Sequence, residues 1–193
     1  AHSVWALARE REDVAGYLPI LTEIINLKRQ EAEAIAEVGT YYDALADEYE
    51  PGMTTADISL MFQELRPTLV GLRRAIRAKD KTPSVTGNFD EKIQLKLAEE
   101  LAVIFGYNLN KGRIDRAVHP FSSGSGDDVR ITTRTDPSDP FNCIYSTIHE
   151  VGHATYEQNI NRDYDFTPLG RGVSLGVHDS LCRRFEKQWG RSR

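Results

Sequence analysis

The sequence contains few cysteines and no long apolar run. Its two cysteines, Cys143 and Cys182, are too few for a disulfide framework and belong to no C-x-x-C spacing, so we expect a protein of the reducing cytoplasm. Either thiol could bind a metal, although free cysteines more often serve as small core residues. No window approaches the roughly 18 to 20 consecutive apolar residues of a membrane span, and residues 1–10 become charged too early for a secretory leader.

An excess of basic residues is also missing. Lys and Arg number 24 against 29 Asp and Glu, and no basic stripe of the kind that binds nucleic acid stands out. We therefore expect neither a nucleic-acid nor a membrane partner. A chain of 193 residues with 40% apolar and 27% charged residues is typical of one globular domain with a packed core. The prediction from these numbers is one domain, with a helical part over residues 1–85 and a second part over residues 86–193.

Most of the apolar residues recur at the spacing of helices. Helices are predicted over 17–38, 41–49, from Thr54 or Thr55 onward, from Asn88 or Asp90 to 105, and over 142–159, with a further helix in 173–186. Pro67 should kink or split the third of these near Arg66. Two short strands, 113–118 and 129–134, flank a loop rich in Ser and Gly at 120–128. The predicted fold class is mainly α, with a small sheet at about 113–134 beside the helix over 142–159.

That helix carries the motif His149-Glu150-Val151-Gly152-His153, an H-E-x-x-H. Residues four apart lie on one face of a helix, so the two imidazoles can bind one metal ion. Glu150 projects to the side, where it can act as a general base on a water without being a ligand. The motif therefore predicts a zinc hydrolase site. The alternative is a chance match on a helix that merely buries two histidines.

A catalytic zinc usually takes three protein ligands and keeps one position for water. The candidates for the third ligand that follow the motif are Glu157, Asp163, Asp165, His178, Asp179 and Glu186. We choose Asp179, because a carboxylate from a second helix after the motif is the arrangement of gluzincins. His178 beside it would support the site or assist the reaction, unless it is an ordinary, partly exposed histidine.

Four motifs in a fixed order make the resemblance specific. They are His119-Pro120-Phe121, Asp128-Val129-Arg130-Ile131-Thr132, the H-E-x-x-H, and His178-Asp179-Ser180. Together they resemble the M32 family of metallocarboxypeptidases, of the thermostable carboxypeptidase Taq type. The resemblance covers essentially the whole chain but less than half of a family member. The family's later R-x-x-A-D and Q-D-x-H-W motifs are not found here, so we expect a fragment or a truncated member.

The resemblance implies a helical zincin-like fold, a homodimer, and removal of C-terminal residues from peptides with zinc or cobalt. By position, it implies that His149, His153 and Asp179 bind the metal and that Glu150 is the catalytic base. It further implies that Arg130, Thr132, His119 and His178 bind the substrate; for Arg130 and Thr132 the alternative is a solvated strand face.

One residue departs from the family pattern. Where the family carries Glu in an H-E-S motif, this chain has Asp179, whose side chain is shorter by one C–C bond, about 1.5 Å. This departure and the shorter length leave two alternatives to a zinc carboxypeptidase. One is a non-catalytic relative that dimerises and binds metal weakly or not at all, and the other is an endopeptidase with an open cleft.

Overall fold

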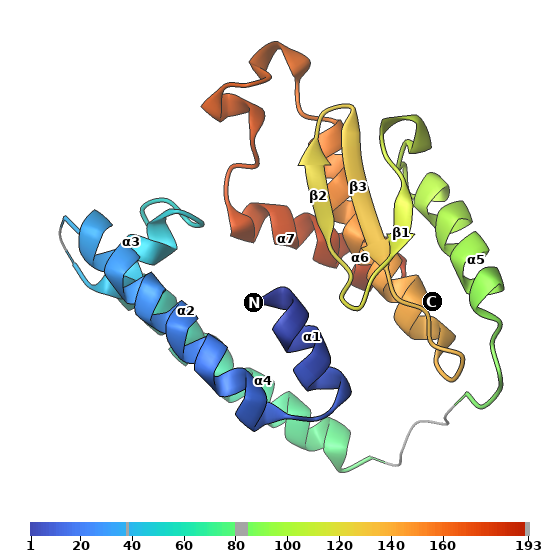
Figure 1. The fold of residues 1–193 in the computed structure, drawn as a ribbon, viewed down its shortest axis with the longest axis horizontal. Helices are drawn as coiled ribbons and strands as arrows, with labels where there is room; N and C mark the ends of the chain where they lie inside the picture. The colour runs from blue at the N-terminus through green and yellow to red at the C-terminus, as the bar shows by residue number, and fades with distance from the viewer. Residues whose placement is uncertain (38, 80–84, 192–193) are drawn as a thin grey trace. The chain divides into compact units, whose positions relative to one another are not determined.

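The computed structural model describes residues 1–37, 39–79 and 85–191. The chain divides into two compact units, Ala1–Thr82 and Pro83–Arg193, and each is described by itself. The first unit contains four helices within its described residues. These are α1 (His2–Glu10), α2 (Val14–Ile35), α3 (Tyr41–Asp47) and α4 (Thr55–Arg77) (Figure 1). The end predicted for the second helix, at Val38, lies outside the described residues.

The helix starts of the first unit follow from capping side chains. Thr40 accepts a hydrogen bond from the backbone of Asp43, whose carboxylate accepts one in return from the backbone of Thr40, and Thr54 and Asp57 repeat this arrangement at α4. Such boxes pair backbone N–H groups that the first helical turn leaves without partners. Helix α2 contacts α1 and α3 and contributes Ala32 as a fully buried residue.

Helix α4 runs without interruption through Pro67, so the predicted split at this proline is wrong. No residue of α4, all of which are described, is buried. A proline inside a helix removes one hydrogen bond and strains the preceding turn, and on an exposed helix the freed carbonyl can turn to water. The apolar side chains of α4 are exposed, among them Phe62, Leu65, Leu69, Leu72 and Ile76.

The second unit places a three-stranded sheet against the motif helix. Its elements include α5 (Glu91–Ile104), β1 (Ile114–Arg116), β2 (Ser122–Ser125), β3 (Asp128–Thr133), α6 (Pro140–Gln158) and α7 (Leu175–Arg183). Short 3-10 turns lie at Leu109–Lys111, Arg162–Tyr164 and Pro168–Gly170, and a π-helical segment spans Arg184–Trp189. Helix α6 contacts β2, β3, α5, α7 and the π-helical segment, so it is the central element of this unit (Figure 1).

The sheet has the order β1-β3-β2, with β1 parallel and β2 antiparallel to β3. Strand β2 lies in the segment 120–128 that we predicted to be a loop, so that part of the prediction is wrong. Its sequence, Ser122-Ser123-Gly124-Ser125, has no apolar alternation, and β3 pairs with it through the backbone, for example Ser123 opposite Arg130. Gly124 is required there, because a Cβ on it would lie 2.0 Å from the carbonyl oxygen of Asp128.

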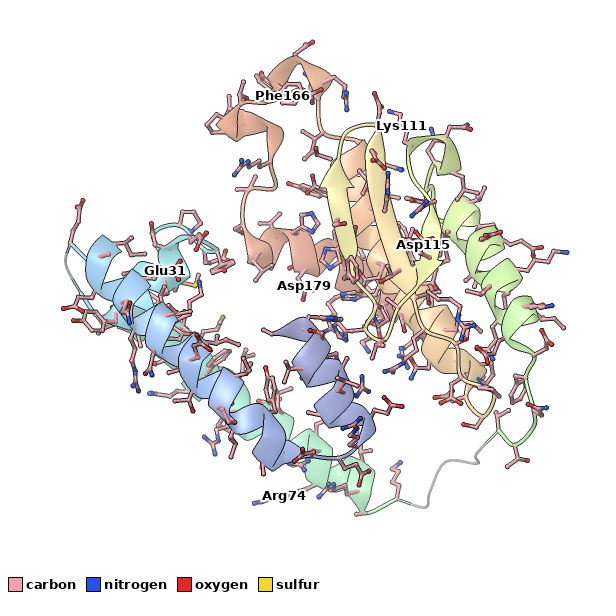
Figure 2. The ribbon with its side chains drawn as sticks, in the orientation of Figure 1. Glu31, Arg74, Lys111, Asp115, Phe166 and Asp179 are labelled. Carbon is pink, nitrogen blue, oxygen red and sulfur yellow. The ribbon has the colours of Figure 1, made fainter. Side chains whose placement is uncertain are left out.

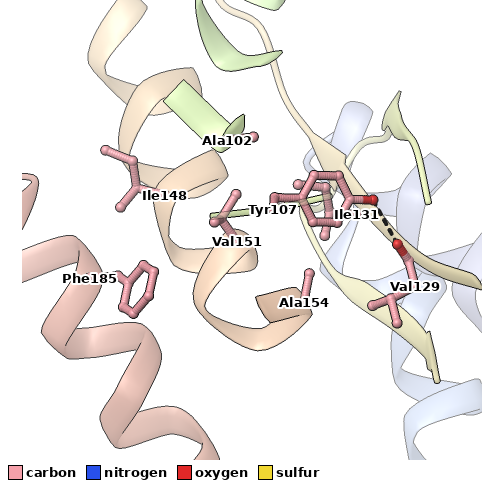
Figure 3. Packing of buried hydrophobic residues seen from close by; sticks show 8 residues of the cluster. All are labelled: Ala102, Tyr107, Val129, Ile131, Ile148, Val151, Ala154 and Phe185. Carbon is pink, nitrogen blue, oxygen red and sulfur yellow. Dashed lines mark hydrogen bonds between the residues drawn. The ribbon is translucent and has the colours of Figure 1, made fainter. Parts of the chain in front are cut away.

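The core of the second unit is enclosed by α5, β3, α6 and the π-helical segment. Figure 3 shows its buried cluster of Ala102, Tyr107, Val129, Ile131, Ile148, Val151, Ala154 and Phe185. Tyr107 donates its hydroxyl to the carbonyl of Val129 at 2.7 Å, which pairs a buried polar group. Burying a side chain such as Ile131 stabilises the fold by about 1.5–3 kcal/mol, and the cluster thereby fixes the orientation of α6 against the sheet.

These elements confirm the predicted fold class, a mainly helical protein with a small sheet beside the motif helix. Among the described residues, no helix is both long enough and apolar enough to cross a membrane.

Candidate metal centre

The H-E-x-x-H motif lies in the second half of α6. The helix begins at Pro140, and the side chain of Asp139 caps it by accepting a hydrogen bond from the backbone N–H of Phe141 at 3.1 Å. The side chains of His149 and His153 are 18% and 19% exposed. Their ring centroids lie 5.0 Å apart. The helical context that the motif requires is therefore present.

Asp179 lies on α7 (Figure 2), and its carboxylate faces the two histidines of α6. The Asp179 Oδ1 atom lies 3.5 Å from His149 Nε2 and 3.9 Å from His153 Nε2. Four tetrahedral ligands at the roughly 2.1 Å of zinc bonds lie about 3.4 Å from one another. The shorter side chain of Asp179 thus comes close to this separation from each histidine nitrogen, and two imidazole nitrogens with a carboxylate oxygen are donors that zinc takes.

Cys182 is another candidate metal ligand near the histidines. Its Sγ atom and one nitrogen from each of His149 and His153 lie within 4.8 Å of one another. The thiol is fully buried and donates to the carbonyl of His178 at 3.2 Å. Burial, followed by the negative charge of Asp179, raises the pKa of Cys182 to about 12. Since zinc binds the thiolate, this environment favours Asp179 over Cys182 as the third ligand.

The catalytic candidate Glu150 is buried, with 7% of its surface exposed. Burial, and then the negative charge of Asp179, raises the pKa of Glu150 to about 7. A carboxylate with a pKa near neutrality is suited to accept and return a proton. Burial and the neighbouring His178 and His149 lower the pKa of His153 to about 4, so its imidazole is neutral at pH 7, as a metal ligand must be.

Glu186, from the π-helical segment, lies behind His149. Its Oε2 atom is 3.3 Å from His149 Nδ1, a buried nitrogen that has no hydrogen-bond partner among the described residues. Burial alone would raise the pKa of Glu186, but hydrogen bonds from Lys187 and Arg191 hold it below its ordinary value. A carboxylate beside the outer nitrogen of a ligand histidine is a common support of zinc sites. This nitrogen and carboxylate therefore fit a histidine that binds metal through Nε2.

His178 lies beside His153, on the outer side of the candidate ligands. Its Nδ1 atom is 2.6 Å from His153 Nδ1, and its Nε2 atom is 2.8 Å from Glu157 Oε1. Glu157, one of the candidates for the third ligand, is thus engaged with His178. Asp165, another of these candidates, pairs with Arg162 at 2.9 Å, and Asp163 lies in the neighbouring 3-10 turn.

A cavity of about 690 Å³ opens beside the motif. Its lining includes the predicted residues His149, Glu150 and His119, together with Arg134, Tyr145, Arg183, Glu186 and Arg191. Arg130 and Thr132, which we predicted to bind substrate, are not among the lining residues. Arg130 pairs with Asp128 at 2.8 Å. The Thr132 hydroxyl accepts from the backbone N–H of Phe121 at 2.9 Å, and its residue is 8% exposed.

Three arginines of the cavity, Arg134, Arg183 and Arg191, were missed by sequence reasoning. Arg134 follows β3 directly and donates to the amide oxygen of Asn142 at 3.0 Å. Arg191 places its guanidinium 3.7 Å from the centre of the Tyr145 ring and pairs with Glu186 at 3.0 Å. The alternation of the polar residues Asp128, Arg130 and Thr132 continues to Arg134 in the sequence, which was the available signal. Arg191 gave none, because its contacts depend on the fold of the π-helical segment.

Comparison with known proteins places this histidine-bearing fold among the metallopeptidases. The family model described as carboxypeptidase Taq (M32) metallopeptidase matches residues 1–193, so the chain belongs to the M32 family. Thermostable carboxypeptidase 1 of Thermus thermophilus is 40% identical over 206 residues, which are 100% of this chain and 40% of that protein. Carboxypeptidase 1 of Bacillus subtilis is 34% identical over 197 residues, 100% of this chain and 39% of that protein.

Solved structures agree with the sequence relatives. The crystal structure of an M32 carboxypeptidase from Deinococcus radiodurans superposes with a TM-score of 0.84 at 40% identity, covering 98% of this chain and 39% of that one. The predicted family is therefore confirmed. The chain spans about 40% of the length of the curated relatives it matches.

Proposed function

We propose that this chain carries the metal centre of a zinc-dependent carboxypeptidase that hydrolyses the C-terminal peptide bond of peptides. The observation that supports it most is the position of Asp179 Oδ1, which lies 3.5 Å from His149 Nε2 and 3.9 Å from His153 Nε2. Membership of the M32 family supports the peptidase reaction. Zinc, when bound there, supplies a Lewis acid that polarises the scissile carbonyl and acidifies a water; cobalt could serve in the same position.

The chain's own residues supply the proton transfer. Glu150 is buried next to His149 on the same helix, and the pKa of about 7 lets its carboxylate take a proton from the attacking water. The same group then returns the proton to the nitrogen of the leaving amino acid. His119 lines the cavity, which supports assigning it a contact with the substrate.

A carboxypeptidase also needs a cation for the terminal carboxylate of its substrate. Arg183 and Arg191 both pair with Glu186. Arg134 donates to the neutral Asn142 and, among the described residues, makes no ion pair with a carboxylate. Arginine binds carboxylates through two parallel N–H groups, so we assign the terminal carboxylate to Arg134.

The test is peptide digestion followed by mass spectrometry. The chain is treated with chelator, reloaded with zinc or cobalt, and mixed with synthetic peptides. Stepwise C-terminal trimming that depends on the metal is expected, and Glu150→Gln should bind zinc normally but trim at least about 100-fold more slowly. Internal cuts would indicate an endopeptidase. Zinc binding without any hydrolysis would overturn the enzyme proposal in favour of a non-catalytic metal-binding protein.

One contact favours the alternative, a non-catalytic protein that binds metal weakly. Arg183 Nε lies 3.6 Å from Asp179 Oδ2, and the Asp179 side chain is 44% exposed. The arginine therefore competes with a metal for the negative charge of Asp179. Metal content after purification without chelator distinguishes tight from weak metal binding. Near-stoichiometric zinc is expected. Less than about 0.1 mole of zinc per mole of chain would contradict the assignment of His149, His153 and Asp179 as ligands.

Self-association is the remaining part of the proposal. The family resemblance implies a homodimer, and the exposed apolar side chains of α4 support self-association. Sedimentation velocity should show a dimer, and a monomer at all concentrations would contradict this. Location in the cytoplasm stays a prediction from the two cysteines.

A further inference from the structure

Three side chains from two helices form a continuous hydrogen-bonded chain behind His153. Glu157 Oε1 meets His178 Nε2 at 2.8 Å, and His178 Nδ1 meets His153 Nδ1 at 2.6 Å. All three are largely buried, with 16–19% of each side chain exposed. The planes of the two imidazoles differ by only 24°, and their centroids are 4.7 Å apart. Because the nitrogens approach so closely, the rings meet edge to edge rather than face to face.

The direction of the hydrogen bonds follows from counting protons. An ionised carboxylate only accepts, so His178 Nε2 must carry a hydrogen and donate it to Glu157. A neutral imidazole has one N–H, which leaves the Nδ1 of His178 as an acceptor. The hydrogen between the two rings then belongs to His153 Nδ1. The Nε2 of His153 is left with a free electron pair, and this is the atom that faces Asp179 Oδ1.

We propose that Glu157 and His178 are positioning residues that hold His153 in the tautomer whose Nε2 can bind the metal. This inference rests on the proposed function. Each candidate histidine ligand is then supported by a carboxylate, one directly and the other through a second imidazole. His149 Nδ1 lies directly beside the carboxylate of Glu186, whereas His153 reaches the carboxylate of Glu157 through His178.

The surroundings keep the His178 ring in the orientation that this role requires. The Tyr156 ring lies 4.5 Å from it, centre to centre, and Gly172 lies so close that a Cβ on it would come within 2.9 Å of His178 Cδ2. These neighbours confine the ring to one plane, and a ring flip within that plane would lose both hydrogen bonds. Supports of this kind typically change metal affinity 10- to 100-fold when they are removed.

The opposite direction of the hydrogen bond between the two rings would place the hydrogens on different nitrogens. If His178 carried hydrogens on both nitrogens, His153 Nδ1 would accept and its hydrogen would move to Nε2. That hydrogen would point at Asp179 and block the metal. The protonation pattern of the two rings therefore decides the proposal without any metal present.

The first test reads that pattern directly. Long-range ¹H–¹⁵N NMR spectra of the metal-free, ¹⁵N-histidine-labelled chain at pH 7 should show His153 protonated on Nδ1 and His178 protonated on Nε2. A hydrogen on His153 Nε2 would overturn the proposal. This readout is independent of catalysis and of folding defects in any variant.

The second test measures zinc affinity by competition with a chromophoric chelator. His178→Leu and Glu157→Leu should each weaken binding about 10- to 100-fold. His178→Asn is the matched control, because its amide oxygen can still accept from His153 Nδ1, and it should stay within about fivefold of the parent chain. Equal affinity in the parent chain and both leucine variants would overturn the proposal. If the parent chain binds no zinc, the proposed function fails, while the NMR pattern still decides whether Glu157 and His178 set the tautomer.

Discussion

Gly152 of α6 lies against Cys182 of α7. A Cβ on Gly152 would lie 2.6 Å from the Cα of Cys182 and 3.2 Å from its Cβ, distances that a packed interior does not tolerate. Glycine thus lets α7 lie directly against the motif helix. This contact brings Asp179 within 3.5 Å of His149, so the candidate metal centre depends on a missing side chain.

Replacing Gly152 by alanine should therefore separate the helices. We expect Gly152→Ala to lower the free energy of unfolding by about 1–3 kcal/mol, the usual cost of overpacking a core, and to weaken zinc binding. Urea unfolding and zinc titration measure the two effects. The matched control is Gly71→Ala in α4, where a Cβ meets nothing within 4 Å and alanine should be neutral or stabilising. Parent-like stability and zinc affinity in Gly152→Ala would contradict this role.

Cys182→Ala distinguishes the two candidates for the third ligand. The thiol is fully buried and its pKa is raised to about 12, mainly by burial, so we expect it to contribute packing and not metal binding. The variant should lose about 1 kcal/mol of stability, as small core deletions do, with zinc affinity within about fivefold of the parent. A loss of binding of 100-fold or more in a folded variant would make Cys182 the ligand.

Asp179→Asn gives the complementary measurement. Its Oδ1 atom lies 3.5 and 3.9 Å from the two histidine nitrogens, and an amide keeps the shape but loses the charge that a metal requires. We expect zinc affinity to fall more than about tenfold, or about 1.4 kcal/mol. Asp163→Asn, in the 3-10 turn Arg162–Tyr164, is the matched acid-to-amide control. Equal affinity in both variants would exclude Asp179 as a ligand.

Arg134 and Arg130 can be separated by kinetics. Arg134 lines the cavity, whereas Arg130 is bound to Asp128 by two hydrogen bonds of 2.8 and 2.9 Å. We expect Arg134→Gln to raise KM about 10- to 100-fold for a peptide with a free C-terminus, the usual effect of losing a charged hydrogen bond. Amidation of that C-terminus should remove the difference between parent and variant. Arg130→Gln should change KM little, and the reverse pattern would restore Arg130 as the substrate residue.

The helices and the motif could be predicted from the sequence because both depend on local spacing. The capping residues Thr54 and Asp90 and the helical context of His149 and His153 follow from neighbours within a few positions. Strand β2 could not be predicted from the sequence, because its serines and glycine form a strand only by pairing with β3. The family resemblance implied a substrate contact for Thr132, yet its hydroxyl accepts a hydrogen bond from the backbone N–H of Phe121.

The contacts that complete the candidate site are all long-range. Arg191 lies on Tyr145, Glu157 meets His178, and Gly152 touches Cys182 only after α7 and the π-helical segment fold back onto α6. Periodicity assigns such residues to a helix face but cannot say which face they meet. The sequence therefore indicated the candidate metal-binding residues, while the residues that support them required the three-dimensional structure.

Asp43 makes the stability of the first unit depend on pH. Its carboxylate accepts hydrogen bonds from the backbone and hydroxyl groups of both Thr40 and Thr55, which connects the start of α3 with the start of α4. The bonds from Thr55 and then Thr40 hold the pKa of Asp43 well below its usual value. In the unfolded chain the group titrates near its ordinary pKa of about 3.9. Its contribution is therefore complete above that pH and is lost as the pH falls toward the folded value.

Acid titration of the metal-free chain tests this contribution. Far-UV circular dichroism in mild urea should show the parent chain losing helix between about pH 4 and pH 2. Asp43→Asn removes the titrating group, so it should be less stable at pH 7, and the gap between the two chains should narrow as the pH falls through this range. Asp57 remains in both chains with the hydrogen bonds from Thr54 that lower its pKa, and only the smaller opposing effect of the Asp43 charge differs between them. A gap that is absent at pH 7, or that stays constant down to pH 2, would contradict the role of Asp43.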